Sequence, residues 1–158
     1  DINEFEKAFQ MHVVCNQILS QTVMKSMKEA GYGRIVNVIS TSVKVPINGL
    51  GVSNTVRGAV ASWAKTMANE LAHCGITINN VLPGFTNTNR LKSLISKKAE
   101  DQKVSEEHIA NVMLSLVPAS RFGEAEEVAN AIAFLCSPAA AYINGINLPV
   151  DGGRTGTL

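Results

Sequence analysis

Two short runs of mostly apolar, β-branched residues constrain the fold more than any other feature of the sequence. They cover residues 34–39 and 76–82, and this composition is typical of strands that are buried on both faces. The segment between them, residues 53–73, carries a helical stripe of apolar side chains formed by Val56, Val60, Trp63, Met67 and Leu71. A helix that connects two such strands pairs them in parallel through a right-handed crossover. The sequence therefore predicts a layered α/β fold.

The remaining segments continue this alternation. Four further helices and a last short strand are predicted at residues 1–30, 91–103, 105–116, 124–136 and 145–150. Three strands are few for a sheet covered on both faces, and no Gly-x-Gly-x-x-Gly motif is present to hold a pyrophosphate. The chain also begins at Asp1 and not at Met. We therefore expect residues 1–158 to form the C-terminal half of a three-layer, doubly wound parallel sheet, a Rossmann-like domain without its N-terminal nucleotide-binding half.

The composition excludes several classes of function. The 158 residues are 46% hydrophobic and 17% charged, which suits one compact domain. A net charge of +1 provides no basic surface for nucleic acid, and no run approaches the ~18 apolar residues of a membrane span. Cys15, Cys74 and Cys136 are odd in number and widely spaced, so we expect neither a disulfide framework nor a metal site. These features favour a cytoplasmic protein with no nucleic-acid or membrane partner.

Candidate functional residues follow the predicted strands, because ligands of parallel α/β sheets bind beyond the carboxyl ends of the strands. Ser40 follows the first strand, and residues 83–88 follow the second. Ser53 and Arg57 are four residues apart and therefore share one face of the next helix. Hydroxyl groups in such places also cap backbone groups, which is the alternative interpretation of each serine. A serine hydrolase is disfavoured, because no Gly-x-Ser-x-Gly motif occurs.

Four motifs occur in order along the chain. They are Gly-Arg-Ile-Val-Asn-Val-Ile-Ser at residues 33–40, Asn-Asn-Val-Leu-Pro-Gly-Phe-Thr-Asn-Thr at 79–88, Arg-Phe-Gly-Glu at 121–124 and Val-Asp-Gly-Gly at 150–153. With these motifs the chain resembles, over its whole length, the short-chain dehydrogenase/reductase family, and most closely its branch of bacterial 3-oxoacyl carrier-protein reductases. The resemblance implies hydride transfer between NAD or NADP and a carbonyl or alcohol carbon of a small molecule.

The resemblance also implies roles for individual residues. Ser40 matches the serine of the family that binds the substrate oxygen. Ser53, thirteen positions later, stands where the family has its proton-donating tyrosine, Arg57 where it has a lysine, and His12 where it has an asparagine. The family's contacts with the nicotinamide fall here on Ile39, Pro83, Gly84, Phe85, Thr86 and Thr88.

Three of the four catalytic positions thus carry a different side chain. A serine hydroxyl is a much weaker acid than a phenol, and arginine stays protonated in proteins. Loss of a positioned acid or base typically costs about 10²–10⁴ in rate. Two functions follow: an oxidoreductase with a modified site, or a catalytically impaired relative that binds cofactor or serves as an assembly subunit. His12 could replace the missing acid/base, or it could simply pack beside Phe5 and Phe9.

Two long helices and one charged segment bear on the assembly and the substrate of the protein. The helices at residues 4–30 and 53–73 carry apolar side chains beyond one stripe, which fits either a second partner or a deep core. In the family these two helices form subunit contacts, so the resemblance implies a homotetramer or homodimer. Residues 90–116 occupy the position of the family's substrate lid, and their charges are interpreted as a solvated face.

Overall fold

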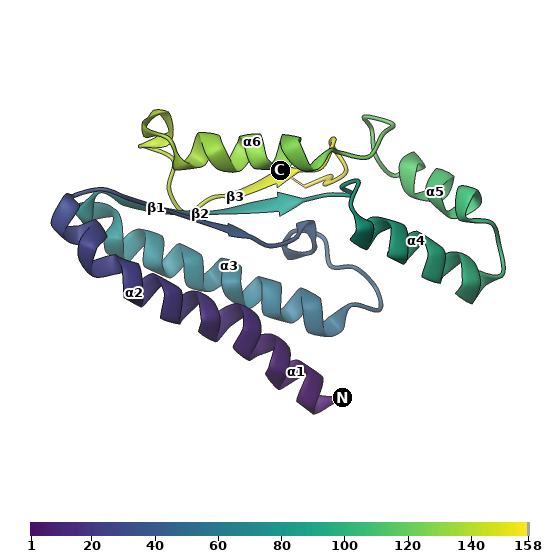
Figure 1. Cartoon of the computed structure of the whole chain (residues 1–158), viewed down its shortest axis with the longest axis horizontal. Coiled ribbons are helices and arrows are strands. Elements are labelled where there is room, and N and C mark those ends of the chain that lie inside the picture. The colour runs from purple at the N-terminus through teal and green to yellow at the C-terminus, as the bar shows by residue number, and fades with distance from the viewer. Residues whose placement is uncertain (158) are drawn as a thin grey trace.

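The computed structural model describes residues 1–157. Three parallel strands form one sheet in the order β1-β2-β3, with bounds Gly33–Val38, Ile76–Pro83 and Asn147–Val150. The helices are α1 (Ile2–Phe9), α2 (Cys15–Ala30), α3 (Gly51–Leu71), α4 (Asn89–Gln102), α5 (Glu106–Ser115) and α6 (Ala125–Cys136). Helices α2 and α3 lie on one face of the sheet and α6 on the other, whereas α4 and α5 lie beyond its carboxyl end (Figure 1). This arrangement confirms the predicted three-layer α/β fold and the parallel pairing.

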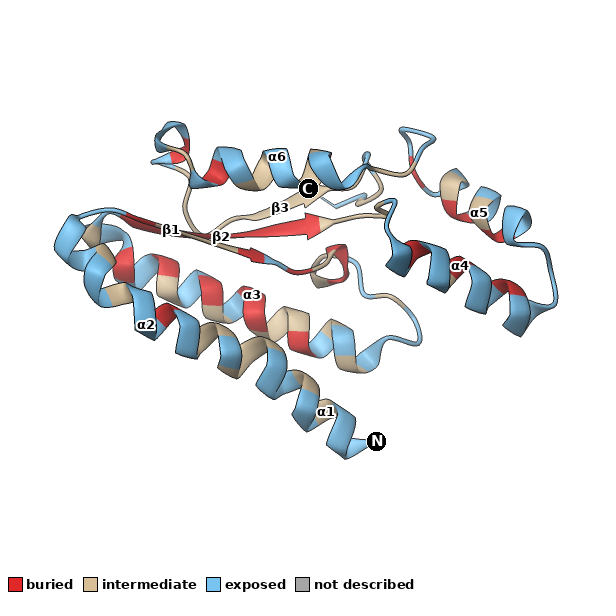
Figure 2. Cartoon of the chain, viewed as in Figure 1, coloured by how far each residue is buried: buried red, intermediate tan, exposed pale blue. Residues whose placement is uncertain are grey.

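The centre of the sheet is β2, whose residues 76–82 are all buried (Figure 2). Strand β1 is covered on both faces as predicted, by α2 on one side and α6 on the other, but it is less deeply buried than β2. Strand β1 lies at the edge of the described sheet, and Val38 at its carboxyl end is 49% exposed. An edge strand has a neighbour on one side only, so the same β-branched composition leads to less burial than in the central strand.

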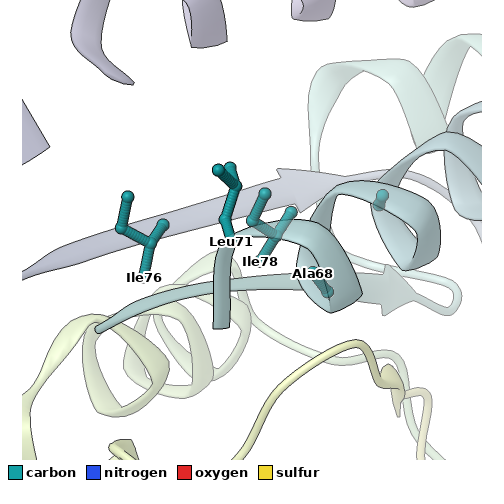
Figure 3. Packing of buried hydrophobic residues seen from close by; sticks show 5 residues of the cluster. Ala68, Leu71, Ile76 and Ile78 are labelled. Carbon is teal, nitrogen blue, oxygen red and sulfur yellow. The ribbon is translucent and has the colours of Figure 1, made fainter. Parts of the chain in front are cut away.

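The core has one apolar layer on each side of the sheet. On one side, Ala68 and Leu71 of α3 pack against Ile76 and Ile78 of β2 (Figure 3). On the other side, Leu135 of α6 joins a buried cluster with Val81 and Ala140. Burial of each large aliphatic side chain contributes about 1.5–3 kcal/mol to folding. The two layers therefore hold the strands, and with them the strand ends, in fixed positions.

The N-terminal helical segment is interrupted where the sequence predicts one continuous helix. A π-helical turn, η1 (Gln10–Val14), separates α1 from α2, and His12 is its central residue. Single π-turns inside α-helices occur frequently at functional sites. The segment ends as predicted at Gly31, which adopts a left-handed conformation with φ of 63°.

Helices α4 and α5 confirm the two predicted surface helices and form a hairpin with its own core. Their buried residues are Leu91, Ile95, Ala99, Ile109 and Met113. Within residues 1–157, no helix is both long and apolar enough to span a bilayer. No group of three or more His, Cys, Asp or Glu side chains in that range is placed to hold a metal ion.

Candidate active site

Strands β1 and β2 end at the same edge of the sheet (Figure 1). Ser40 lies two residues after the last residue of β1, and Pro83 is the last residue of β2. Ser40 is the N-cap of a short 3-10 turn, η2 (Thr41–Val43), and its hydroxyl oxygen accepts a hydrogen bond from the Ser42 N–H at 3.1 Å. Ser40 therefore caps a backbone N–H group, which was the alternative interpretation of this serine from the sequence. The cap uses an oxygen lone pair and leaves the hydroxyl proton free to be donated to a ligand.

A cavity of about 440 Å³ opens at this edge. All six residues predicted to contact a nicotinamide line it, namely Ile39, Pro83, Gly84, Phe85, Thr86 and Thr88. Sequence reasoning missed the opposite wall, which consists of Arg90, Leu91 and Leu94 of α4 with Ala125 and Val128 of α6. Helix α4 follows β2 after a short loop, whereas α6 is brought to this edge only by folding. The cavity is thus bounded by three segments of the chain and is mostly apolar.

The segment after β2 is held by backbone hydrogen bonds to two neighbouring segments. The Gly84 N–H donates to the Val150 carbonyl at 2.9 Å, and Gly123 exchanges two bonds with the backbone of Phe85 and Asn87. These two bonds form an isolated parallel bridge between Thr86 and Gly123. Within residues 1–157, the Thr86 N–H itself makes no hydrogen bond. It therefore remains available to a ligand such as an amide oxygen.

A second cavity, of about 350 Å³, lies between η1 and the start of α3. His12, Ser53 and Arg57 all line it, so the structure brings three of the four predicted catalytic residues together. The fourth, Ser40, does not line this cavity. It lies two residues after Val38, whose carbonyl oxygen accepts a hydrogen bond from Arg57 Nη1 at 3.3 Å. Ser40 lines neither cavity, whereas its neighbour Ile39 lines the larger one.

Electrostatics in the second cavity depend on Arg57. Burial lowers the pKa of the half-buried Arg57 guanidinium, which nevertheless stays charged at neutral pH. Burial also lowers the pKa of the His12 imidazole, and the positive charge of Arg57 lowers it further. His12 is therefore mainly neutral at pH 7 and is suited to accept a proton. Ser53 is exposed, at the mouth of this cavity.

Comparison with known proteins agrees with these features. A family model described as enoyl-(acyl carrier protein) reductase matches residues 1–155. The chain belongs to the short-chain dehydrogenase/reductase family. Within the family it is similar to 3-oxoacyl-[acyl-carrier-protein] reductase FabG of Escherichia coli, with 37% identity over 135 residues, and to that of Vibrio cholerae, with 39% over 137. Each match covers 85% of this chain but 51% of the relative, so the chain spans about half the length of these reductases.

Solved structures of other short-chain dehydrogenases show the same fold. YwfH, an NADPH-dependent reductase involved in bacilysin biosynthesis, superposes with a TM-score of 0.93 at 26% identity and covers 100% of this chain and 61% of its own. A gluconate 5-dehydrogenase from Burkholderia cenocepacia, in complex with NADP and tartrate, gives a TM-score of 0.87 at 25% identity. That match covers 100% of this chain and 58% of the dehydrogenase.

The two tyrosines lie away from the position at which the family places its catalytic phenol. The Tyr32 hydroxyl donates to the Cys136 carbonyl at 3.1 Å, and the Tyr142 side chain is fully exposed. Both line a different cavity, together with Arg34 at the start of β1. Neither of the two cavities at the carboxyl edge is lined by a tyrosine among residues 1–157.

Arg154 is a site residue that sequence reasoning missed. Its guanidinium lies 4.4 Å from the ring centroid of Phe85, and Nη1 donates to Thr41 Oγ1 at 3.4 Å. Arg154 thereby connects the loop that begins at Ser40 with a wall of the larger cavity. The two bonded partners are distant in the sequence, and none of the family motifs above marks this arginine.

Proposed function

We propose that this chain carries the C-terminal part of an NAD(P)-dependent oxidoreductase domain, which acts on a carbonyl or alcohol carbon of a small molecule. One observation carries the proposal: the six residues that match the family's nicotinamide contacts line one cavity, beside a second cavity lined by His12, Ser53 and Arg57. The match with these relatives covers 85% of this chain but only 51% of the relative. We therefore infer that a preceding half supplies the adenine and phosphate site.

The larger cavity fits a nicotinamide ring in both shape and chemistry. Its walls are mostly apolar, and the Thr86 N–H is free for a carboxamide oxygen. Neighbouring structures named as NADPH-dependent or NADP-bound support NADP, and NAD is the alternative. When bound, such a cofactor supplies or accepts the hydride. The Pro83–Thr88 segment would orient it, because that segment is fixed by its bonds to Val150 and Gly123.

In this proposal, Ser40 donates its free hydroxyl proton to the substrate oxygen. Arg57 supplies a fixed positive charge that stabilises negative charge developing on that oxygen. The neutral imidazole of His12 accepts the proton when an alcohol is oxidised, and it must first be protonated to donate one to a carbonyl. Because its pKa is lowered, carbonyl reduction through His12 should be faster below neutral pH. Ser53 contributes a hydroxyl at the mouth of the same cavity.

A cofactor-binding or assembly subunit with little turnover is the second candidate. The absence of a phenol from both cavities favours it, and so does a surface of exposed apolar side chains on η1 and α2. That surface includes Met11 at 60%, Ile18 at 56% and Leu19 at 60% exposure. Exposed apolar side chains on neighbouring helical turns are typical of subunit contacts, which supports a homodimer or homotetramer.

The test uses the protein with any residues that precede Asp1. It is mixed with NADPH or NADH and a panel of carbonyl compounds, and absorbance of the reduced cofactor is followed. Turnover whose near-neutral pH dependence disappears in His12→Asn supports the modified oxidoreductase. Cofactor binding without turnover, together with activity gained in Ser53→Tyr/Arg57→Lys, supports the assembly subunit. Absence of cofactor binding would overturn both the oxidoreductase and the cofactor-binding subunit and would favour a purely structural assembly subunit.

A further inference from the structure

The cavity around Arg57 contains a positive charge that no neighbouring side chain neutralises. Within residues 1–157, the only ion pair joins Arg121 and Glu127. The single hydrogen bond of the Arg57 side chain in that range goes to the neutral carbonyl of Val38. A guanidinium that is half-buried without a carboxylate has lost water and gained little in return. An anionic ligand would supply the opposite charge and the hydrogen-bond acceptors that this guanidinium lacks.

The acidic residue on the cavity wall does not supply that anion. Glu4 lines the same cavity but is exposed, and among residues 1–157 it forms no ion pair with Arg57. Burial lowers the pKa of Arg57, with no opposing effect from a carboxylate. Glu4 and Arg57 are the charged residues that line this cavity with His12, and of these two only Arg57 adds to the effect of burial on the imidazole pKa.

The donors around the cavity match a carboxylate. Arg57 keeps Nε and Nη2 for a bidentate contact, which a planar guanidinium makes preferentially with carboxylate or phosphate oxygens. Ser53 adds a hydroxyl one helical turn earlier. Beside the polar side chains of Glu4 and His12, the wall has an apolar part with Leu50, Val52 and Val56, which suits a short carbon chain better than a phosphate ester. A serine in place of a tyrosine also leaves the volume that such a group needs.

We propose that this cavity binds the carboxylate of the substrate, so that the protein prefers oxo acids and hydroxy acids to neutral ketones and alcohols. The substrate class named here rests on the proposed oxidoreductase function, whereas the binding of a carboxylate does not. A bound carboxylate would offset the field of Arg57 at His12. The imidazole would then take up a proton more readily, and the substrate itself would prepare the proton donor for reduction.

Nuclear magnetic resonance of the three histidines tests the binding directly. Each imidazole is titrated in the free chain, with levulinate, a small oxo acid, and with methyl levulinate, its neutral ester. Levulinate should raise the pKa of His12 and leave His73 and His108 unchanged, and the ester should move none of them. An unchanged His12 titration, or an equal effect of the ester, would overturn the proposal.

Variants assign the effect to Arg57. In Arg57→Gln, levulinate should bind at least about tenfold more weakly, because the charge-assisted contact is lost. Lys97→Gln removes an exposed cation on α4 and should leave the affinity unchanged. Unaltered signals of His73 and His108 would show that the Arg57→Gln chain is folded. Equal levulinate binding in that folded variant would refute the assignment.

A measurement of turnover distinguishes failure of the carboxylate proposal from failure of the proposed oxidoreductase function. Levulinate binding that depends on Arg57, with no cofactor-dependent turnover of any substrate, would support the carboxylate site and refute the oxidoreductase function. If neutral ketones are reduced as fast as oxo acids, the proposed substrate class is refuted, but the oxidoreductase function is supported.

Discussion

Replacing Asn80 by alanine would remove the central member of a ladder of side-chain amides that crosses the whole sheet. Asn80 Oδ1 accepts from Asn37 Nδ2 at 2.9 Å, and Asn80 Nδ2 donates to Asn147 Oδ1 at 2.8 Å. The three residues are direct partners in the strand register, and Asn16 of α2 extends the ladder by donating to Asn37 at 3.3 Å. Because Asn37 lies three residues before Ser40, the ladder holds the strand ends that carry the candidate site.

The cost of this substitution can be worked out from burial. Asn37 is only 9% exposed and Asn80 2%, so the Asn37 amide loses its acceptor in a place that water reaches poorly. A buried group left without its partner costs about 1–3 kcal/mol. Asn147 is half-buried, and water replaces part of its lost bond. We therefore expect Asn80→Ala to lower the free energy of unfolding by about 2–4 kcal/mol.

Urea unfolding followed by circular dichroism measures this loss. Asn130→Ala is the matched control, because Asn130 is exposed on α6 and its truncation should change stability by less than about 0.5 kcal/mol. Adding Asn147→Ala to the Asn80→Ala chain should cost less than Asn147→Ala alone, since the bond between them is already gone. A loss below about 1 kcal/mol for Asn80→Ala, or strict additivity of the pair, would contradict the ladder's role.

Other perturbations test separate parts of the structure. The hydrogen bond from Arg121 lowers the pKa of Glu127 to about 2, so nuclear magnetic resonance should find it there and find it much nearer 4.5 in Arg121→Ala. The ionised Glu127 carboxylate should stabilise the fold above pH 4.5, and this stabilisation should be lost as the pH falls towards 2. Acid unfolding of the unchanged chain and of Arg121→Ala measures the difference. In Gly84→Ala the new Cβ would lie 2.6 Å from Asp151 Cβ, and calorimetry should show a destabilisation of about 1–3 kcal/mol. Leu135→Ala, at a side chain only 1% exposed, should cost about 2–5 kcal/mol in urea unfolding.

The layers of the fold could be predicted because they depend on local periodicity. The apolar stripe of residues 53–73 and the β-branched runs around it predict α3, β1 and β2 without knowledge of their contacts. The exposure of Val38 could not be predicted in this way, since a strand's position at the edge is a property of the assembled sheet. The π-turn around His12 was also missed, because one extra residue in a helical turn hardly changes the spacing of apolar side chains.

The candidate site could be predicted only where its residues belong to recognisable sequence motifs. The motif marks the segment from Pro83 to Thr88, and all of this segment except Asn87 lines the larger cavity. Arg154 and the amide ladder were not predicted, because they depend on pairs far apart in the chain. Asn80, for example, is 43 residues from Asn37 and 67 from Asn147. Sequence separation of this size leaves no periodic signal.

In the proposed function, His12, Ser53 and Arg57 have to be considered together, because they line one cavity. A serine where the family would place its phenol leaves space in this cavity, and Arg57 carries a charge that cannot be given up as a proton. Burial lowers the pKa of the His12 imidazole and the charge of Arg57 lowers it further, so at neutral pH the imidazole accepts a proton more readily than it donates one. In the carboxylate proposal, an acid bound at Arg57 offsets only the second of these two effects. The proposal therefore predicts faster reduction of oxo acids than of neutral ketones at the same pH, whereas an inactive subunit would reduce neither.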